Sequence, residues 1–275
     1  GKDKNMIVSP EEPLKSCDNC GKKIWVQDEQ ILDTWFSSGL WPLATLGFPD
    51  NTKELKKYFP WNFEISAPEI KFLWIARMIM ISSYFKKEIP FYNMFFHGTL
   101  RDREGRKFSK SFGNGLYPKE FAERWGVDAL RAALFTYSAP GRDGRISKQT
   151  LDERCKNFRN FITKIKNVAK FVLELKPKIA EISDFSHKED MGILKKLEEV
   201  ENGVKKNFEE FELHLALENI YNFIWHEFAD KYIEQSKKRR TEAQACLENV
   251  LKRSVKLIAP FMPSAADDIM KKWQP

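Results

Sequence analysis

The stretch GRKFSKS at residues 105–111, followed by Gly113 and Asn114, decides how the chain is interpreted. Its two lysines lie three positions apart, with a small hydroxyl residue between them and glycines on either side. Such a segment forms a flexible cationic loop that can fold over a triphosphate. Most loops rich in lysine and arginine are ordinary solvated surface. The position of this loop in the fold therefore has to show whether it binds a ligand.

The residues before the loop predict a parallel α/β sheet. Residues 62–66 suit a short strand, residues 68–86 repeat apolar side chains at helical spacing, and residues 92–100 suit a buried strand. Ligands bind such sheets at the carboxyl ends of the strands, and the cationic loop directly follows the second strand. We therefore expect half of an α/β domain over residues 31–147, with further helices at 118–125 and 127–137.

Beyond residue 148 the pattern changes to long helical periodicity with few breaks. The expected boundaries are Pro177, the stretch 183–188, and Pro260 with Pro263. Four or five long helices imply a bundle, so the predicted fold class is α/β plus all-α, with the all-α domain at 148–275. The predicted helices are 151–175, 190–208, 214–240 and 241–259.

The composition limits the class of protein. A length of 275 residues suits two domains, and a formal charge of +7 with a pI near 9.0 favours a polyanionic partner. No apolar run approaches the roughly 20 residues that span a bilayer, so we expect no membrane partner. Four cysteines are too few for a disulfide scaffold and the first residues do not resemble a signal peptide, so we expect a cytoplasmic protein.

Residues 1–30 are polar and resemble a remnant of a zinc ribbon. Cys17 and Cys20 form a CxxC turn, which supplies two of the four ligands of a tetrahedral zinc site. Neither Cys155 nor Cys246 has a CxxC partner or a nearby histidine, so a complete site requires residues upstream of Gly1. The alternative is a surface turn with free thiols.

The motif KFSKS at residues 107–111 resembles the KMSKS signature of class I aminoacyl-tRNA synthetases, and HGTLRDREGR at 97–106 resembles the segment that precedes it in that family. The resemblance implies that Lys110 contacts ATP and helps to neutralise the reacting phosphorus, assisted by Lys107 and Ser109. It implies that His97 and Gly98 belong to the ATP site, with Gly98 near the adenine. Phe108 replaces the family's methionine, and we expect its side chain to pack beneath the loop.

Within this family the sequence ILDTWFSSGLWP at residues 31–42 is most similar to the enzymes that use valine. The resemblance places Trp35 and Trp74 at the wall of an aliphatic amino-acid pocket, although large aromatics in α/β folds are usually core residues. Where the family has Gly-aromatic-Asp beside the ribose and amino acid, this chain has Ala67-Pro68-Glu69. Glu69 could accept a hydroxyl hydrogen bond there, but losing the glycine crowds a close backbone approach.

The helical region continues the resemblance. RNF at residues 159–161 and KIKN at 164–167 are similar to the start of the family's anticodon-binding domain. The basic side chains there suit contacts with a tRNA backbone, and they equally suit ordinary solvated positions. The candidates are Lys156, Arg159, Lys164, Lys166, Lys237, Lys238, Arg239 and Arg240.

The resemblance implies a valine–tRNA ligase that uses ATP and Mg²⁺ to activate valine and then charges tRNA(Val), acting as a monomer. The chain's histidines include no H-x-G-H arrangement, which the class I active site needs. We therefore expect this motif upstream of Gly1, with a first zinc knuckle and an editing insertion, and expect the isolated chain to be inactive. The alternatives are an isoleucyl or other class I enzyme, and a tRNA-binding module without catalysis.

Overall fold

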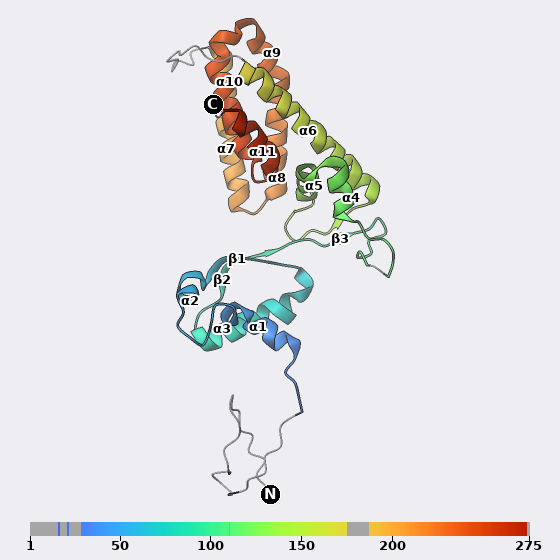
Figure 1. Ribbon diagram of the computed structural model, residues 1–275, viewed down its shortest axis with the longest axis vertical. Helices are drawn as coiled ribbons and strands as arrows, with labels where there is room; N and C mark the ends of the chain where they lie inside the picture. The colour runs from blue at the N-terminus through green and yellow to red at the C-terminus, as the bar shows by residue number, and fades with distance from the viewer. Residues whose placement is uncertain (1–15, 17–20, 22–28, 110, 175–186, 274–275) are drawn as a thin grey trace.

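The computed structural model describes residues 16, 21, 29–109, 111–174 and 187–273. The described part is elongated, with an α/β unit at one end and a helical bundle at the other (Figure 1). The cationic loop lies between them. Within the described residues, no helix is both long and apolar enough to cross a membrane.

The α/β unit is built around two parallel strands, β1 (Trp61–Ser66) and β2 (Phe91–Phe96). A continuous helical segment joins them, which confirms the strand–helix–strand pattern predicted from the sequence. It begins with a 3-10 turn, continues as a π-helical turn and ends as an α-helix. Its parts are η1 (Pro68–Ile70), η2 (Lys71–Ile75) and α3 (Ala76–Lys86), and two further helices precede β1, α1 (Thr34–Ala44) and α2 (Lys53–Tyr58).

Helix α1 packs closely against the helical segment that joins the strands. A side chain at Gly39 would place its Cβ 2.7 Å from Ile81 Cδ1, so glycine allows this approach. The Trp74 indole Nε1 donates to the carbonyl of Ser38 over 2.9 Å. Asp33 caps α1 by accepting from the Trp35 amide over 2.8 Å.

The prediction of one strand over residues 92–100 is wrong at its carboxyl end. Strand β2 stops at Phe96, and Leu100–Arg101 forms a separate strand, β3, which pairs in parallel with β4 (Gly144–Arg145). Between them the chain turns at Gly98, where a Cβ would lie 1.6 Å from the Arg142 carbonyl oxygen. A backbone contact over this sequence distance leaves no local pattern, so the sequence did not reveal the break.

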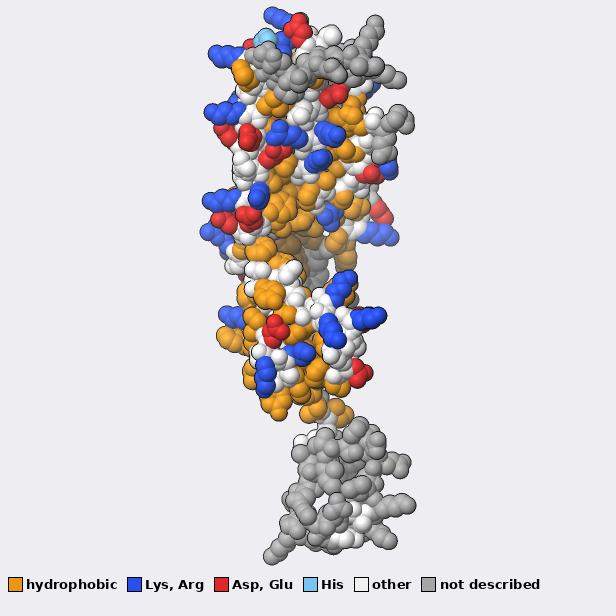
Figure 2. Space-filling view, turned by 90° about the vertical axis from the view of Figure 1, so that its left-hand side faces the viewer, with side chains coloured by type: hydrophobic (Ala, Val, Ile, Leu, Met, Phe, Trp, Pro, Cys, Tyr) orange, Lys and Arg blue, Asp and Glu red, His pale blue; other side chains and the backbone are white. Residues whose placement is uncertain are grey.

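The sheet of β1 and β2 exposes much apolar surface. Parallel strands are usually covered on both faces, yet Ile65 is 53% exposed and Tyr92 is 61% exposed. Hydrophobic side chains gather on the surface of this α/β unit in the space-filling view (Figure 2). Part of the sheet is covered by Phe211 from the bundle, whose ring lies 4.9 Å from that of Phe63 and 6.1 Å from that of Phe95.

The predicted helices of the C-terminal region are confirmed with small shifts at their ends, except for the one predicted over 214–240, which is a succession of α-helical, π-helical and 3-10 segments. One helix was not predicted: α11 (Pro263–Met270), whose first turn is capped from α5, where Asp128 Oδ2 accepts from the Ala265 amide over 2.6 Å. The remaining elements are α4 (Pro118–Trp125), α5 (Val127–Phe135), α6 (Lys148–Glu174), α7 (Lys188–Glu209), α8 (Leu213–Asn222), η3 (Phe223–Tyr232), α9 (Ile233–Ser236), η4 (Lys237–Arg239), α10 (Arg240–Ile258) and η5 (Lys271–Trp273).

A buried polar cluster joins three segments of the bundle. Asp190 at the start of α7 accepts from the Tyr232 hydroxyl over 2.6 Å and from the Arg239 guanidinium over 3.0 Å. Burial alone would raise the pKa of Asp190, but these hydrogen bonds outweigh it and lower that pKa. The ion pair therefore fixes α7 against the segment that precedes α10.

Candidate active site

Asp102 organises the first half of the cationic loop. Asp102 is 6% exposed, and its carboxylate accepts from the Arg106 amide and from Arg106 Nε, each over 2.8 Å. Asn114 Nδ2 donates to the same carboxylate over 2.9 Å. Burial acts to raise the pKa of Asp102, but the hydrogen bonds from Asn114 and Arg106 lower it to about 2. Asp102 is therefore an ionised anchor for the loop.

Asn114 closes the loop from the other end. Its Oδ1 accepts from the Ser109 amide over 2.9 Å, and its Nδ2 also lies 3.3 Å from the Lys107 carbonyl oxygen. One amide side chain thus fixes the backbone on both sides of Phe108. Neither Asp102 nor Asn114 was assigned a role from the sequence, although the Gly113-Asn114 pair after the motif was a usable signal for a turn.

Lys107 and Glu69 join the carboxyl ends of the two neighbouring strands. The Lys107 ammonium lies 2.5 Å from Glu69 Oε1, and the Thr99 hydroxyl donates to the same oxygen over 3.2 Å. The hydrogen bond from Lys107 is the main cause that lowers the pKa of Glu69 to about 2. Glu69 follows β1 and Lys107 belongs to the loop after β2, as ligand sites in open α/β sheets require.

A second ion pair fixes the base of the loop. Asp143 Oδ2 lies 2.5 Å from Arg101 Nε, and Asp143 Oδ1 accepts from the Thr99 amide over 2.8 Å. The Arg101 guanidinium is the first of the causes that lower the pKa of Asp143. Together with the pairing of β3 and β4, these contacts hold the residues on either side of the loop in register.

His97 and Gly98, the two residues expected in the ATP site, lie where β1 and β2 end. The His97 amide donates to the carbonyl of Ser66 over 3.1 Å, and His97 Nδ1 lies 2.9 Å from the Gly98 carbonyl oxygen. The absent side chain of Gly98 makes room for the Arg142 backbone. A role for either residue in ATP binding stays a prediction.

Of the two other expected catalytic residues, the structure describes Ser109 but not Lys110. Lys110 lies outside the described residues. Ser109 Oγ is 2.7 Å from Ser111 Oγ, so the two hydroxyls of the motif share one hydrogen bond. The roles implied for Lys107, Ser109 and Lys110 remain predictions.

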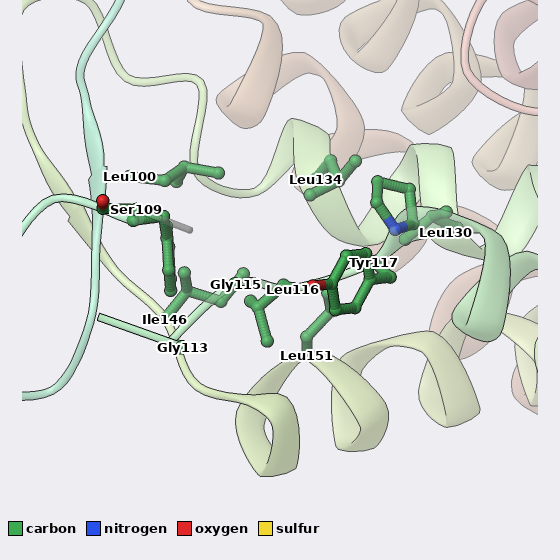
Figure 3. Close-up of a pocket in the computed structure, with 12 residues that line it drawn as sticks. Leu100, Ser109, Gly113, Gly115, Leu116, Tyr117, Leu130, Leu134, Ile146 and Leu151 are labelled. Carbon is green, nitrogen blue, oxygen red and sulfur yellow. The ribbon is translucent and has the colours of Figure 1, made fainter. Parts of the chain in front are cut away.

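An apolar cavity of about 540 Å³ lies beneath the loop (Figure 3). Phe108 lines it and packs, partly buried, against the large core of the bundle, as predicted for this position. Gly113 and Gly115 border the same cavity, opposite Leu130 and Leu134 of α5. The loop is thus seated against apolar side chains of α5, of α6 and of the β3–β4 pair.

Trp35 and Trp74, the predicted walls of an amino-acid pocket, lie in the contact between α1 and η2. The Arg77 guanidinium lies 5.9 Å from the centre of the Trp35 ring, and Trp74 is held by its hydrogen bond to Ser38. These contacts are structural ones. A role for Trp35, Trp74 or Glu69 toward valine stays a prediction.

Several predicted tRNA contacts take part in ion pairs within the bundle. Arg239 is only 12% exposed and is bound to Asp190, so its guanidinium is committed to the internal cluster. The pairs of the other four are Lys164 with Asp230, Lys166 with Asp268, Lys237 with Glu234 and Arg240 with Glu174.

Three of the predicted tRNA contacts form no ion pair with another described residue. Lys156 and Arg159 are exposed on α6, and Lys238 is exposed at the turn before α10. In the part of the chain that the structure covers, no carboxylate forms an ion pair with any of the three. They are the best-placed members of the predicted set for binding phosphate groups.

The predicted zinc ligands Cys17 and Cys20 lie outside the described residues. Among the residues that are described, no three histidine, cysteine or acidic side chains cluster as metal ligands would. Cys155 and Cys246 are free and buried, and burial raises the pKa of each thiol to about 11. They are therefore core residues.

Sequence comparisons relate both parts of the chain to tRNA ligases. Residues 2–147 match the family of class I tRNA synthetases (I, L, M and V), and residues 190–274 match the anticodon-binding domain of tRNA ligases. The valine–tRNA ligase of Clostridium tetani is 42% identical over 96% of this chain, and that of Thermotoga maritima is 38% identical over 95%. The chain spans 30–31% of the length of these curated relatives.

Solved structures share the fold. The agnB2 LeuRS of Agrobacterium radiobacter K84, solved with tRNA and LeuAMS, superposes on 94% of this chain and 34% of its own with a TM-score of 0.76 at 20% identity. A Mycobacterium tuberculosis methionyl-tRNA synthetase bound to methionyl-adenylate covers 83% of this chain and 47% of its own, with a TM-score of 0.66 at 25% identity. Because the family model covers more than half of the residues, the chain belongs to the class I aminoacyl-tRNA synthetase family of isoleucyl, leucyl, methionyl and valyl enzymes.

Proposed function

We propose that this chain supplies the ATP-loop half of the active site and the tRNA-binding domain of a valine–tRNA ligase. The whole enzyme would join valine to ATP as valyl-adenylate, release pyrophosphate, and transfer valine to tRNA(Val). The observation that carries the proposal is the likeness to valine–tRNA ligases over almost the full chain. The position of Lys107 at the carboxyl ends of β1 and β2 supports it.

The work of this chain would be positioning and charge stabilisation. Lys107 and Lys110 would bind the triphosphate, while Asp102 and Asn114 hold the loop that carries them. Mg²⁺ would neutralise phosphate charge. The described residues offer no cluster of acidic ligands for it, which fits a cation held chiefly by phosphate oxygens and water.

The proposal includes a tRNA partner on the bundle. Lys156, Arg159 and Lys238 would contact the phosphate backbone, because their charges are free of ion pairs in the described chain. We place the protein in the cytoplasm as a monomer, and we propose that Cys17 and Cys20 form half of a zinc site completed by residues outside this sequence. Zinc content measured with and without a Cys17→Ser substitution tests that site.

A second candidate, a tRNA-binding module without catalysis, is favoured for the isolated chain because it has no H-x-G-H motif. We expect the isolated chain to bind tRNA(Val) in a salt-sensitive way without forming an adenylate. Adenylate formation by the isolated 275-residue chain would contradict this expectation.

The decisive test is ATP–pyrophosphate exchange by the full-length natural polypeptide with valine and, separately, with isoleucine. We expect exchange with valine, and preference for isoleucine would favour the isoleucyl alternative. Removing a well-placed donor to a developing anion costs about a hundredfold or more in rate, so Lys110→Ala should lose exchange by that factor and keep its thermal stability. Unchanged exchange by this variant would refute the role of the loop.

A further inference from the structure

Glu69 binds the first lysine of the signature loop although the two residues are far apart in the sequence. Glu69 Oε1 lies 2.5 Å from the Lys107 ammonium and also accepts the Thr99 hydroxyl over 3.2 Å. The Thr99 amide is in turn held by Asp143. The carboxylate is thus oriented by a second contact while it binds the lysine.

This ion pair is open to exchange. The Lys107 side chain is 54% exposed and that of Glu69 is 39% exposed, so solvent and a ligand can reach both. Exposed ion pairs contribute little, because water competes for both charges. A triphosphate offers the ammonium several charged oxygens in place of one carboxylate.

We infer that Glu69 and the triphosphate of ATP compete for the Lys107 ammonium, so that Glu69 is a positioning residue that weakens ATP binding. The inference rests on the proposed function. When the triphosphate arrives, a carboxylate at 2.5 Å from Lys107 would stand beside phosphate oxygens of the same charge. Lys107 therefore exchanges partners, and Glu69 moves away from the phosphate.

The local sequence makes this contact possible. Pro68 begins the 3-10 turn, which places Glu69 in its first turn directly after β1. An aspartate at position 69 would be shorter by one methylene, about 1.5 Å. It would keep the charge and lose the direct contact with Lys107. Glu69→Asp and Glu69→Gln thus separate the length of the side chain from its charge.

The test uses the full-length natural polypeptide. Acylation of the Lys107 amine by an N-hydroxysuccinimide ester is quantified by peptide mass spectrometry, with and without Mg·ATP, and the Kd for ATP is measured by calorimetry. Glu104→Gln is the matched control, because Glu104 lies in the same loop region, is exposed, and pairs with Arg106. It removes one negative charge without touching Lys107.

We expect Glu69→Gln to raise the acylation of Lys107 and to tighten ATP binding, each by about 1.5- to 5-fold relative to Glu104→Gln. Glu69→Asp should raise acylation similarly and tighten ATP binding less. If ATP protects Lys107 in every variant with equal Kd values, the competition is refuted and the proposed function stands. If ATP protects Lys107 in no variant, the proposed function fails, and the competition fails with it.

Discussion

Asn114 donates from its side-chain amide to Asp102 over 2.9 Å, and so ties the end of the cationic loop to its beginning. The same amide oxygen holds the backbone of Ser109. Lys107 is thus carried by a closed hydrogen-bonded turn, and such preorganisation lowers the entropy that a side chain loses when it binds a ligand.

Replacing this amide should loosen the loop. We expect Asn114→Ala to raise the hydrogen-exchange rate of the Ser109 amide and to lower kcat/KM for adenylate formation by roughly 2- to 10-fold, the net worth of one or two hydrogen bonds. The matched control is Asn93→Ala, because Asn93 donates to the Asn62 carbonyl on the exposed sheet. Equal effects of the two substitutions would contradict the role of Asn114.

A side chain at position 98 should damage the fold. In Gly98→Ala the new Cβ would lie 1.6 Å from the Arg142 carbonyl oxygen, so the backbone must move. We expect the free energy of unfolding to fall by at least ~2 kcal/mol and the Tm to fall by roughly 4–8 °C. Gly192→Ala in α7 is the control, since nothing lies within 4 Å of its Cβ, and it should be neutral or stabilising. A Tm unchanged by Gly98→Ala would show that the close approach is absent.

Phe211 should couple the bundle to the sheet. Its ring lies 4.9 Å from that of Phe63, between the turn after α7 and strand β1. A double-mutant cycle with Phe211→Ala and Phe63→Ala should give a coupling energy of about 0.5–1.5 kcal/mol in denaturant unfolding. Additive effects of the two substitutions would mean that the rings do not interact.

Removing Arg239 should leave a buried carboxylate without its cation. Because the Asp190 side chain is 5% exposed, we expect Arg239→Ala to destabilise the protein by roughly 3–5 kcal/mol at pH 7. Lys237→Ala is the control, because Lys237 forms an exposed pair with Glu234. Similar losses in both variants would contradict the structure of the cluster.

The pH dependence of the same cluster follows from the lowered pKa of Asp190. A carboxyl whose pKa is lower in the folded state stabilises the fold above its ordinary value of 3.8, and loses this contribution as the pH falls through the folded-state value. The contribution should thus stay constant between pH 8 and about 5. In Arg239→Ala the destabilisation should shrink in acid, because a protonated Asp190 no longer needs a cation. If the difference in unfolding free energy between the natural protein and Arg239→Ala stayed the same down to a pH of about 3, this role of Asp190 would be contradicted.

Binding of tRNA by α6 should appear in the salt dependence of the affinity. We expect Lys156→Gln with Arg159→Gln to reduce the slope of log K against log salt by about 1 for each phosphate group that the variant no longer neutralises. Lys237→Gln, whose partner is Glu234, should leave the slope nearly unchanged. A slope unaffected by the double substitution would remove α6 from the tRNA interface.

The sequence predicted those parts of the fold that depend on local patterns. Strand β1, helix α4 and the long helices follow from periodicity and from prolines at helix starts. Helix α11 was missed although Pro263 at its start is a local signal; its capping residue, Asp128, is 137 positions away from Ala265 in the chain. The pairing of β3 with β4 was missed because the backbone contact between Gly98 and Arg142 has no local signature.

For the site, residue types predicted the position of the loop and the packing of Phe108, but not which charges are already paired. From the sequence alone, Arg239 and Lys156 are equal candidates for phosphate contacts. In the folded chain Arg239 is bound to Asp190, whereas Lys156 is exposed on α6. Side-chain pairing depends on which helices meet, and periodicity alone does not provide that.

The contact between Gly98 and Arg142 bears on how this chain can change in evolution. It involves the carbonyl oxygen of Arg142 and not its side chain, so any residue at position 142 can provide it except proline, which could not donate to the Ala139 carbonyl as the Arg142 amide does. Every residue at position 98 except glycine would bring a Cβ into that oxygen. Random substitution should therefore be tolerated at position 142 and rejected at position 98, although the two residues form the same contact.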